Sequence, residues 1–230
     1  MRIFLFFTLL FLAGEIKALE SQPPKDSVKS KSKIKNLVFP LIGRAPETNW
    51  AFGIASATVF RTKASDTLLR SSTIPVGIIY TVKHQIIVGL GANIYFPGEK
   101  YILRLENTFS KFPDRFWGLG YNSPESNMEN YTYGQFYFNP TFLRKVYKDY
   151  FAGLSYEYQK VFYLHYQQGG LFDREQIVGR NGGVVSGVGY EISKDSRNNS
   201  YSPSKGMLIR LVGVLFNKSI LSDYNYLLYS

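Results

Sequence analysis

The feature that most constrains this chain is a two-residue alternation of side-chain type that runs through long segments. In residues 50–60 the even positions carry mostly bulky side chains, and the odd positions carry small ones. Successive side chains of a β-strand point to opposite faces, so this alternation predicts strands with two different faces. The same pattern returns in seven further segments, which gives about eight strands: residues 72–81, 86–96, 101–109, 131–143, 150–166, 184–193 and 207–216.

The length of these segments favours strands that cross a membrane. A tilted membrane-spanning strand needs about 9–11 residues, whereas strands of soluble proteins average nearer 5–6. In lipid every backbone amide must be paired, so a spanning sheet has to close on itself. We therefore predict an all-β protein that forms an antiparallel transmembrane β-barrel. A soluble, tyrosine-rich β-sandwich is the alternative.

The barrel hypothesis assigns a place to polar and aromatic side chains. Charged or amide side chains at alternate positions should face the barrel interior: Arg104, Glu106, Glu157, Gln159 and Glu191. Aromatic side chains near strand ends should form girdles at the two membrane interfaces: Phe96, Tyr101, Phe109, Tyr131, Tyr201 and Phe216.

Composition argues against an enzyme. The chain has no cysteine, which excludes thiolate metal sites, cysteine nucleophiles and disulfides. Its two histidines, His84 and His165, are far apart in sequence, so a multi-histidine metal site is not expected. No G-x-S-x-G motif supports a serine nucleophile. We expect no catalytic residue, no cofactor and no bound metal.

The net charge of +10 raises nucleic acid as a partner, but its distribution points elsewhere. Five lysines are concentrated in a short Ser/Lys run near the N-terminus: Lys25, Lys29, Lys31, Lys33 and Lys35. No helix-turn-helix, zinc-finger or RNA-binding motif accompanies them. A basic linker beside an anionic membrane surface explains the run, so the expected partners are outer-membrane lipid and other envelope proteins, with no nucleic acid.

The N-terminal residues predict export. Residues 1–18 combine Arg2, a short apolar core and Ala18, which is the pattern of a signal peptide. An N-terminal membrane anchor is the alternative, although the apolar run is shorter than the about 20 residues that a spanning helix needs. Residues 19–36 are expected to form a basic flexible linker, and residues 37–230 the barrel. The expected location is the bacterial outer membrane.

Residues 194–206 carry a more specific pattern than alternation. Asp195 and Asn198 can cap turn amides, Arg197 can bind carboxylates or carbonyls, Pro203 fixes its φ angle, and Gly206 tolerates a turn. These residues resemble a hairpin of the bacterial surface antigen family, the outer-membrane assembly barrels of the BamA/TamA type. An aromatic, glycine-rich connection at 111–125 and an opening strand at 40–60 are similar to that family as well.

The resemblance implies a role in outer-membrane protein or lipid assembly, through an unstable barrel seam and local thinning of the bilayer. It also implies a sixteen-stranded barrel, of which about eight strands are present. No POTRA domains precede the sheet, and the family's late Arg-Gly loop is missing. Because residues 223–230 read as the opening of another strand, we expect a truncated sequence.

Three alternatives stay open. The first is a small structural or adhesion barrel that closes with eight strands, by pairing the strand near Trp50 with the strand near Met207. The second is a nonfunctional truncated fragment. The third is an outer-membrane enzyme of the phospholipase or protease type, which would need a catalytic constellation on the barrel wall.

Overall fold

The computed structural model describes residues 34–230, except 46–47, 67, 122, 199 and 201–202. The expected signal peptide and all but the last residues of the expected linker lie outside the described residues. The last two residues of the expected linker belong to the first strand, which begins at Lys35. No helix in the described part of the chain is long and apolar enough to span a membrane.

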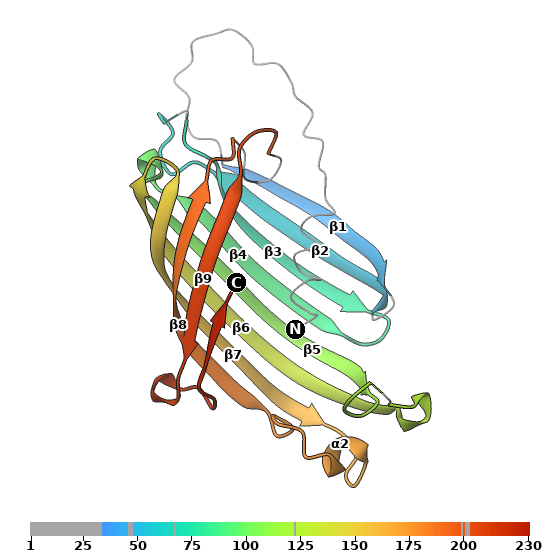
Figure 1. Ribbon diagram of the computed structural model, residues 1–230. Coiled ribbons are helices and arrows are strands. Elements are labelled where there is room, and N and C mark those ends of the chain that lie inside the picture. Colours follow the sequence, from blue (N-terminus) through green and yellow to red (C-terminus); the bar gives the residue numbers. More distant parts are fainter. Residues whose placement is uncertain (1–33, 46–47, 67, 122, 199, 201–202) are drawn as a thin grey trace.

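The described residues form one antiparallel sheet of ten strands, each paired with its neighbours in sequence (Figure 1). The strands are β1 (Lys35–Ala45), β2 (Asn49–Phe60), β3 (Ser72–Thr81), β4 (Ile86–Tyr95), β5 (Tyr101–Phe116), β6 (Glu129–Tyr147), β7 (Tyr150–His165), β8 (Gly183–Asp195), β9 (Leu208–Phe216) and β10 (Tyr226–Tyr229). Short helices lie in the connections: η1 (Pro97–Glu99), η2 (Glu125–Asn127), α2 (Leu171–Arg174) and η3 (Lys218–Ile220).

The eight expected segments correspond to β2–β9, so the all-β, antiparallel prediction is confirmed. Two further strands extend the sheet at its edges, β1 on one side and β10 on the other. Because β1 pairs with β2 and β10 pairs with β9, the strands near Trp50 and Met207 do not pair with each other. The described sheet is not closed, and β1 and β10 are its two edges.

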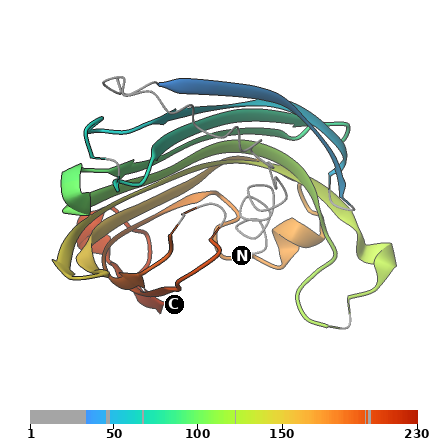
Figure 2. The same ribbon diagram turned by 90° about the horizontal axis from the view of Figure 1, so that it is seen from above.

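The sheet curls into a trough (Figure 2). The edge strand β1 runs along one margin, and β9 with β10 runs along the other. One end of the trough holds the β8–β9 connection, and we call it the motif end. The other end holds the β7–β8 connection with α2, and we call it the α2 end.

A small apolar core fills the trough at the motif end. The β2–β3 connection carries Leu69, which packs with a ring of buried side chains from four strands: Tyr95, Ile102, Leu143 and Phe151. Each of the strands β4, β5, β6 and β7 contributes one of these side chains, and all four lie on the concave face of the sheet.

Two of the aromatic residues expected in the girdles face the concave side instead. Phe216 is 1% exposed and stacks on Tyr226, with ring centroids 4.3 Å apart. Tyr131 packs against Tyr133 and against Phe172 of α2. The girdle prediction was wrong for these residues because position near a strand end does not determine which face a side chain takes. Tyr201 lies outside the described residues.

Candidate functional site

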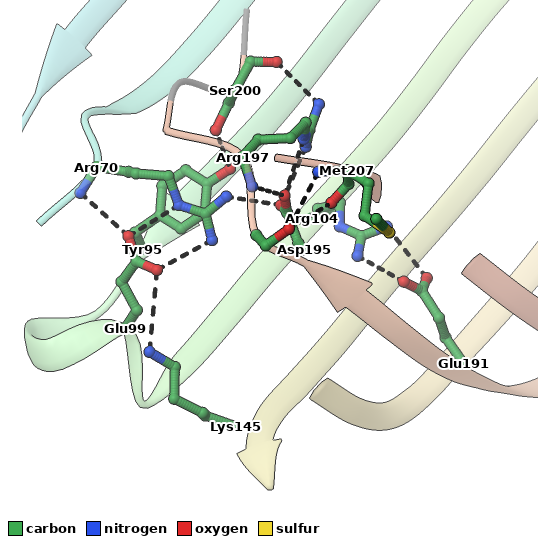
Figure 3. A network of polar contacts seen from close by, with 11 residues as sticks. Arg70, Tyr95, Glu99, Arg104, Lys145, Glu191, Asp195, Arg197, Ser200 and Met207 are labelled. Carbon is green, nitrogen blue, oxygen red and sulfur yellow. Dashed lines mark hydrogen bonds and ion pairs between the residues drawn. The ribbon is translucent and has the colours of Figure 1, made fainter. Parts of the chain in front are cut away.

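The curled sheet brings charged side chains from distant strands together on its concave face. Arg104 of β5 reaches Glu191 of β8, although β6 and β7 lie between them in the sheet. The two groups meet through two hydrogen bonds, Arg104 Nη2 to Glu191 Oε1 at 2.6 Å and Nη1 to Oε2 at 3.1 Å. Arg210 of β9 donates to the same carboxylate at 3.0 Å. Glu191 is 1% exposed, so one buried carboxylate joins three strands. Figure 3 shows its contact with Arg104.

A second network lies at the rim of the motif end, and we call it the rim network: Arg70, Glu99, Lys145, Asp195 and Arg197. Arg70 is its centre (Figure 3). Its Nε donates to Glu99 Oε1 at 2.8 Å, and its Nη1 donates to Asp195 Oδ2 at 2.6 Å. The guanidinium also lies over the ring of Tyr95, 4.5 Å from the centroid. The network ties the β2–β3 connection to η1 and to the end of β8.

The residues of the expected hairpin motif take distinct roles in the β8–β9 connection. Asp195 accepts hydrogen bonds from the backbone N–H and the Nε of Arg197. Asn198 Oδ1 accepts from the backbone N–H groups of Ser204 and Lys205, both at 3.1 Å. Arg197 Nη1 also donates to the Ser200 carbonyl.

Gly206 and Pro203 complete the hairpin motif. Gly206 has φ +91, and a Cβ there would meet the Ser196 carbonyl, so only glycine fits without strain. Pro203 is exposed. The motif therefore has a local structural role that its residue types explain. That this hairpin belongs to the surface antigen family stays a prediction.

The two arginines of the rim network lie outside the strands, and both are held in the charged form. Burial alone would lower the pKa of Arg70, but its hydrogen bonds to Glu99 and Asp195 raise it above the ordinary arginine value. The hydrogen bond to Asp195 likewise raises the pKa of Arg197. Both arginines are thus fixed positive charges at the rim.

The sequence alone predicts part of these two charged networks. Arg104 and Glu191 were expected on the interior face, and they lie there together. Arg70 and Glu99 were not singled out, because both lie in connections where alternation gives no signal. The only available hint was an arginine next to the apolar Leu68-Leu69 pair, in a connection that is otherwise polar.

The convex face has the opposite character. Every strand from β2 to β9 exposes apolar side chains on it. Examples along successive strands are Phe52, Ile54, Val76, Ile78, Val88, Leu90, Phe109, Phe142, Leu154, Val188, Ile192, Leu211 and Leu215. An apolar face of this extent on a folded chain indicates a contact with lipid or with another apolar surface.

Aromatic and cationic side chains flank this apolar face at both ends. At the motif end Lys194 lies over the ring of Tyr150, and Lys100 over that of Tyr101. At the α2 end Arg44 lies over Trp50. Such pairs are typical of side chains at a boundary between an apolar and a polar medium.

The histidines do not assemble a site. His84 Nδ1 lies 2.6 Å from the hydroxyl of Tyr80 in the β3–β4 turn. His165 packs edge-on against Tyr163 at the end of β7. Within the described ranges no group of three or more metal-ligating side chains occurs. The expectation of a protein without catalytic residues or a cofactor stays a prediction.

Comparison with known proteins found no similarity to report. No protein-family model matches the chain, no curated protein matches it, and no solved structure matches its fold.

Proposed function

We propose that this chain is an outer-membrane β-barrel protein whose ten described strands form part of the barrel wall. The observation that carries the proposal is the reversed polarity of the two faces. The convex face exposes apolar side chains on every strand from β2 to β9, whereas Arg104, Glu191 and Arg210 pair on the concave face. A lipid-exposed barrel needs an apolar exterior and tolerates a polar interior.

The height of the apolar face supports the proposal. On β5 the convex positions run from Tyr101, beside Lys100, to Phe109, two residues before Lys111. Eight residue steps of about 3.4 Å give about 27 Å along the strand. At a tilt of about 40° this corresponds to about 21 Å across a membrane, close to the apolar band of about 25 Å in known barrels.

A membrane-spanning sheet also requires that its two edge strands, β1 and β10, be covered. An unpaired amide in hydrocarbon costs several kcal/mol, so a bare edge along β1 is not stable in a bilayer. In the membrane we expect the edges to be covered by each other, by further strands or by a second chain. Resemblance of the 194–206 hairpin to the surface antigen family supports a larger barrel and a role in outer-membrane protein or lipid assembly.

Folding into lipid tests the proposal directly. The protein, refolded with phospholipid vesicles, should resist extraction by alkaline carbonate and should migrate on a detergent gel as a compact band that shifts on boiling. Complete extraction together with a single unshifted band would refute a membrane-spanning barrel.

Cysteine cross-linking tests how the edges are covered, and the chain has no native cysteine to interfere. Pairs such as Ile42→Cys with Leu227→Cys should cross-link within one chain if β1 meets β10. Cross-linking between chains would assign the cover to a second copy. The matched control, Ile42→Cys with Phe52→Cys, joins register partners of β1 and β2 and should always cross-link.

A further inference from the structure

The cations of the motif end divide according to the face that they occupy. Lys145 faces the concave side, where its Nζ lies 4.0 Å from Glu99 and over the ring of Phe151. Its neighbour Arg144 is exposed on the opposite face and pairs in register with Tyr101. Among the described residues Arg144 forms no ion pair.

Two more cations lie at the same end of the sheet. The register pairs Arg144–Ala152 and Tyr150–Lys194 place Lys194 two strands from Arg144, and Lys148 lies in the β6–β7 turn. Lys194 of β8 is the register partner of Tyr150 of β7, and its Nζ lies 5.4 Å from the centre of that ring. Lys148, in the β6–β7 turn, lies 5.1 Å from the ring centre of Tyr147. Asp149 belongs to the same turn, yet neither lysine forms an ion pair with it or with another described carboxylate.

The cations inside and outside the trough differ in whether a carboxylate pairs with them. Inside the trough Glu191 supplies the carboxylate for Arg104 and Arg210, and at the rim Glu99 supplies one for Arg70. Outside, Arg144, Lys148 and Lys194 lie at the end of the apolar face, beside aromatic rings, and none of them forms an ion pair with a carboxylate in the described part of the chain. A partner that presents both an apolar body and an anionic group at this height would satisfy the whole surface.

We propose that Arg144, Lys148 and Lys194 bind the phosphate of an anionic phospholipid, whose acyl chains lie along the convex apolar face. This inference rests on the proposed membrane-spanning function. The aromatic rings of Tyr147 and Tyr150 occupy the interfacial layer, where amphipathic rings are stabilised. The cations extend from the same turn and strands toward the headgroup, as long basic side chains do at interfaces.

Lipid binding by the folded protein in neutral detergent tests this assignment. Native mass spectrometry with added phosphatidylglycerol or phosphatidylcholine gives the dissociation constant of the first bound lipid. Near a membrane surface a single cation strengthens anionic-lipid binding by about fivefold, so we expect a preference for phosphatidylglycerol of about tenfold or more. The triple variant Arg144→Gln, Lys148→Gln, Lys194→Gln should lose it.

A matched variant separates a defined site from general attraction. Lys111→Gln, Lys160→Gln, Lys218→Gln removes the same charge from exposed lysines nearer the α2 end and should keep most of the preference. Equal loss in both triple variants, or no preference in the native protein, would overturn the assignment. Displacement of the lipid by equimolar inorganic phosphate would also overturn it, since that result assigns a site for a free anion.

Carbonate extraction distinguishes failure of the headgroup site from failure of the proposed membrane-spanning barrel. A protein that resists extraction but shows no lipid preference retains the barrel and loses the headgroup site. A protein that is extracted completely loses both.

Discussion

The two faces of one sheet differ in how they satisfy charge, and the difference shows which medium each face is built for. On the concave face the buried carboxylate of Glu191 is held by Arg104 and Arg210, so charge is neutralised within the chain. On the convex face apolar side chains cover the middle of the strands, and cations such as Lys194 lie at the ends beside aromatic rings. A soluble sheet normally shows the reverse, with its apolar side chains packed in the curl.

The largest expected effect comes from breaking the neutralisation on the concave face. Glu191→Ala leaves Arg104 and Arg210 without their shared carboxylate, and loss of one partner of a buried ion pair costs about 3–5 kcal/mol. We expect the free energy of unfolding in lipid vesicles to fall by an amount within that range, because Glu191 is 1% exposed and two arginines lose their shared partner. Urea titration followed by the heat-modifiable band measures it.

The control for Glu191 lies on the same face. Glu106 is exposed there and forms no ion pair within the described ranges, so Glu106→Ala should change the free energy of unfolding little. Equal destabilisation by the two variants would contradict a special role for the Arg104–Glu191–Arg210 cluster.

The second prediction reverses the polarity of the convex face. Val188 lies near the middle of the apolar band on β8 and is 49% exposed. Val188→Arg should destabilise the protein in lipid by about 2–4 kcal/mol, the cost of an arginine near the bilayer midplane on a barrel wall. The same urea titration measures the change.

Glu106→Arg introduces the same side chain on the concave face, where Glu157 lies in the same row beyond Asn139. This variant should be tolerated. If Val188→Arg were tolerated equally well in vesicles, the convex face would not be in contact with lipid.

The sequence predicted the contrast between the faces better than it predicted how the sheet is arranged in space. Alternation placed β2–β9 and put Arg104 and Glu191 on the interior side, because a period of two depends only on local geometry. It did not reveal that Arg70 meets Asp195, since the two are 125 residues apart and Arg70 lies in a connection. The alternation of β9 does put Phe216 on the face of Arg210, but the girdle prediction used only the position of Phe216 near a strand end.

The third prediction concerns the rim network. Arg70→Gln removes charge-assisted hydrogen bonds to Glu99 and Asp195, each of which contributes about 1.5–3 kcal/mol. Because the two carboxylates keep other partners in Lys145 and Arg197, we expect a net loss near the value for one bond. Arg70→Lys should restore only part of the stability, because an ammonium cannot contact both carboxylates with the fork geometry of a guanidinium. Full rescue by lysine would mean that charge alone matters at this position.

The smallest expected effects on stability come from glycine-to-alanine variants, which should differ between the concave and the convex face. A Cβ on Gly153, on the concave side of β7, would meet the backbone of Phe142 and Leu143, which cannot move without shifting β6. The three nearest atoms to a Cβ on Gly213, on the convex side of β9, would all belong to the far end of the Tyr190 side chain, which can rotate outward. We expect Gly153→Ala to lower the free energy of unfolding by about 1–2 kcal/mol, as overpacking against a rigid neighbour does.

Gly213→Ala should cost less, about 0.5 kcal/mol, because the atoms that it meets are the far end of the Tyr190 side chain, which can move. Urea titration of the pair in one vesicle preparation measures both. The close approach of β6 and β7 at Gly153 also follows from the bending of the sheet, because glycine marks positions where a neighbouring backbone comes near. If Gly213→Ala proved the more damaging variant, the ring of Tyr190 would have to be fixed by a neighbour on the convex side, and the open apolar contact inferred for that face would be wrong.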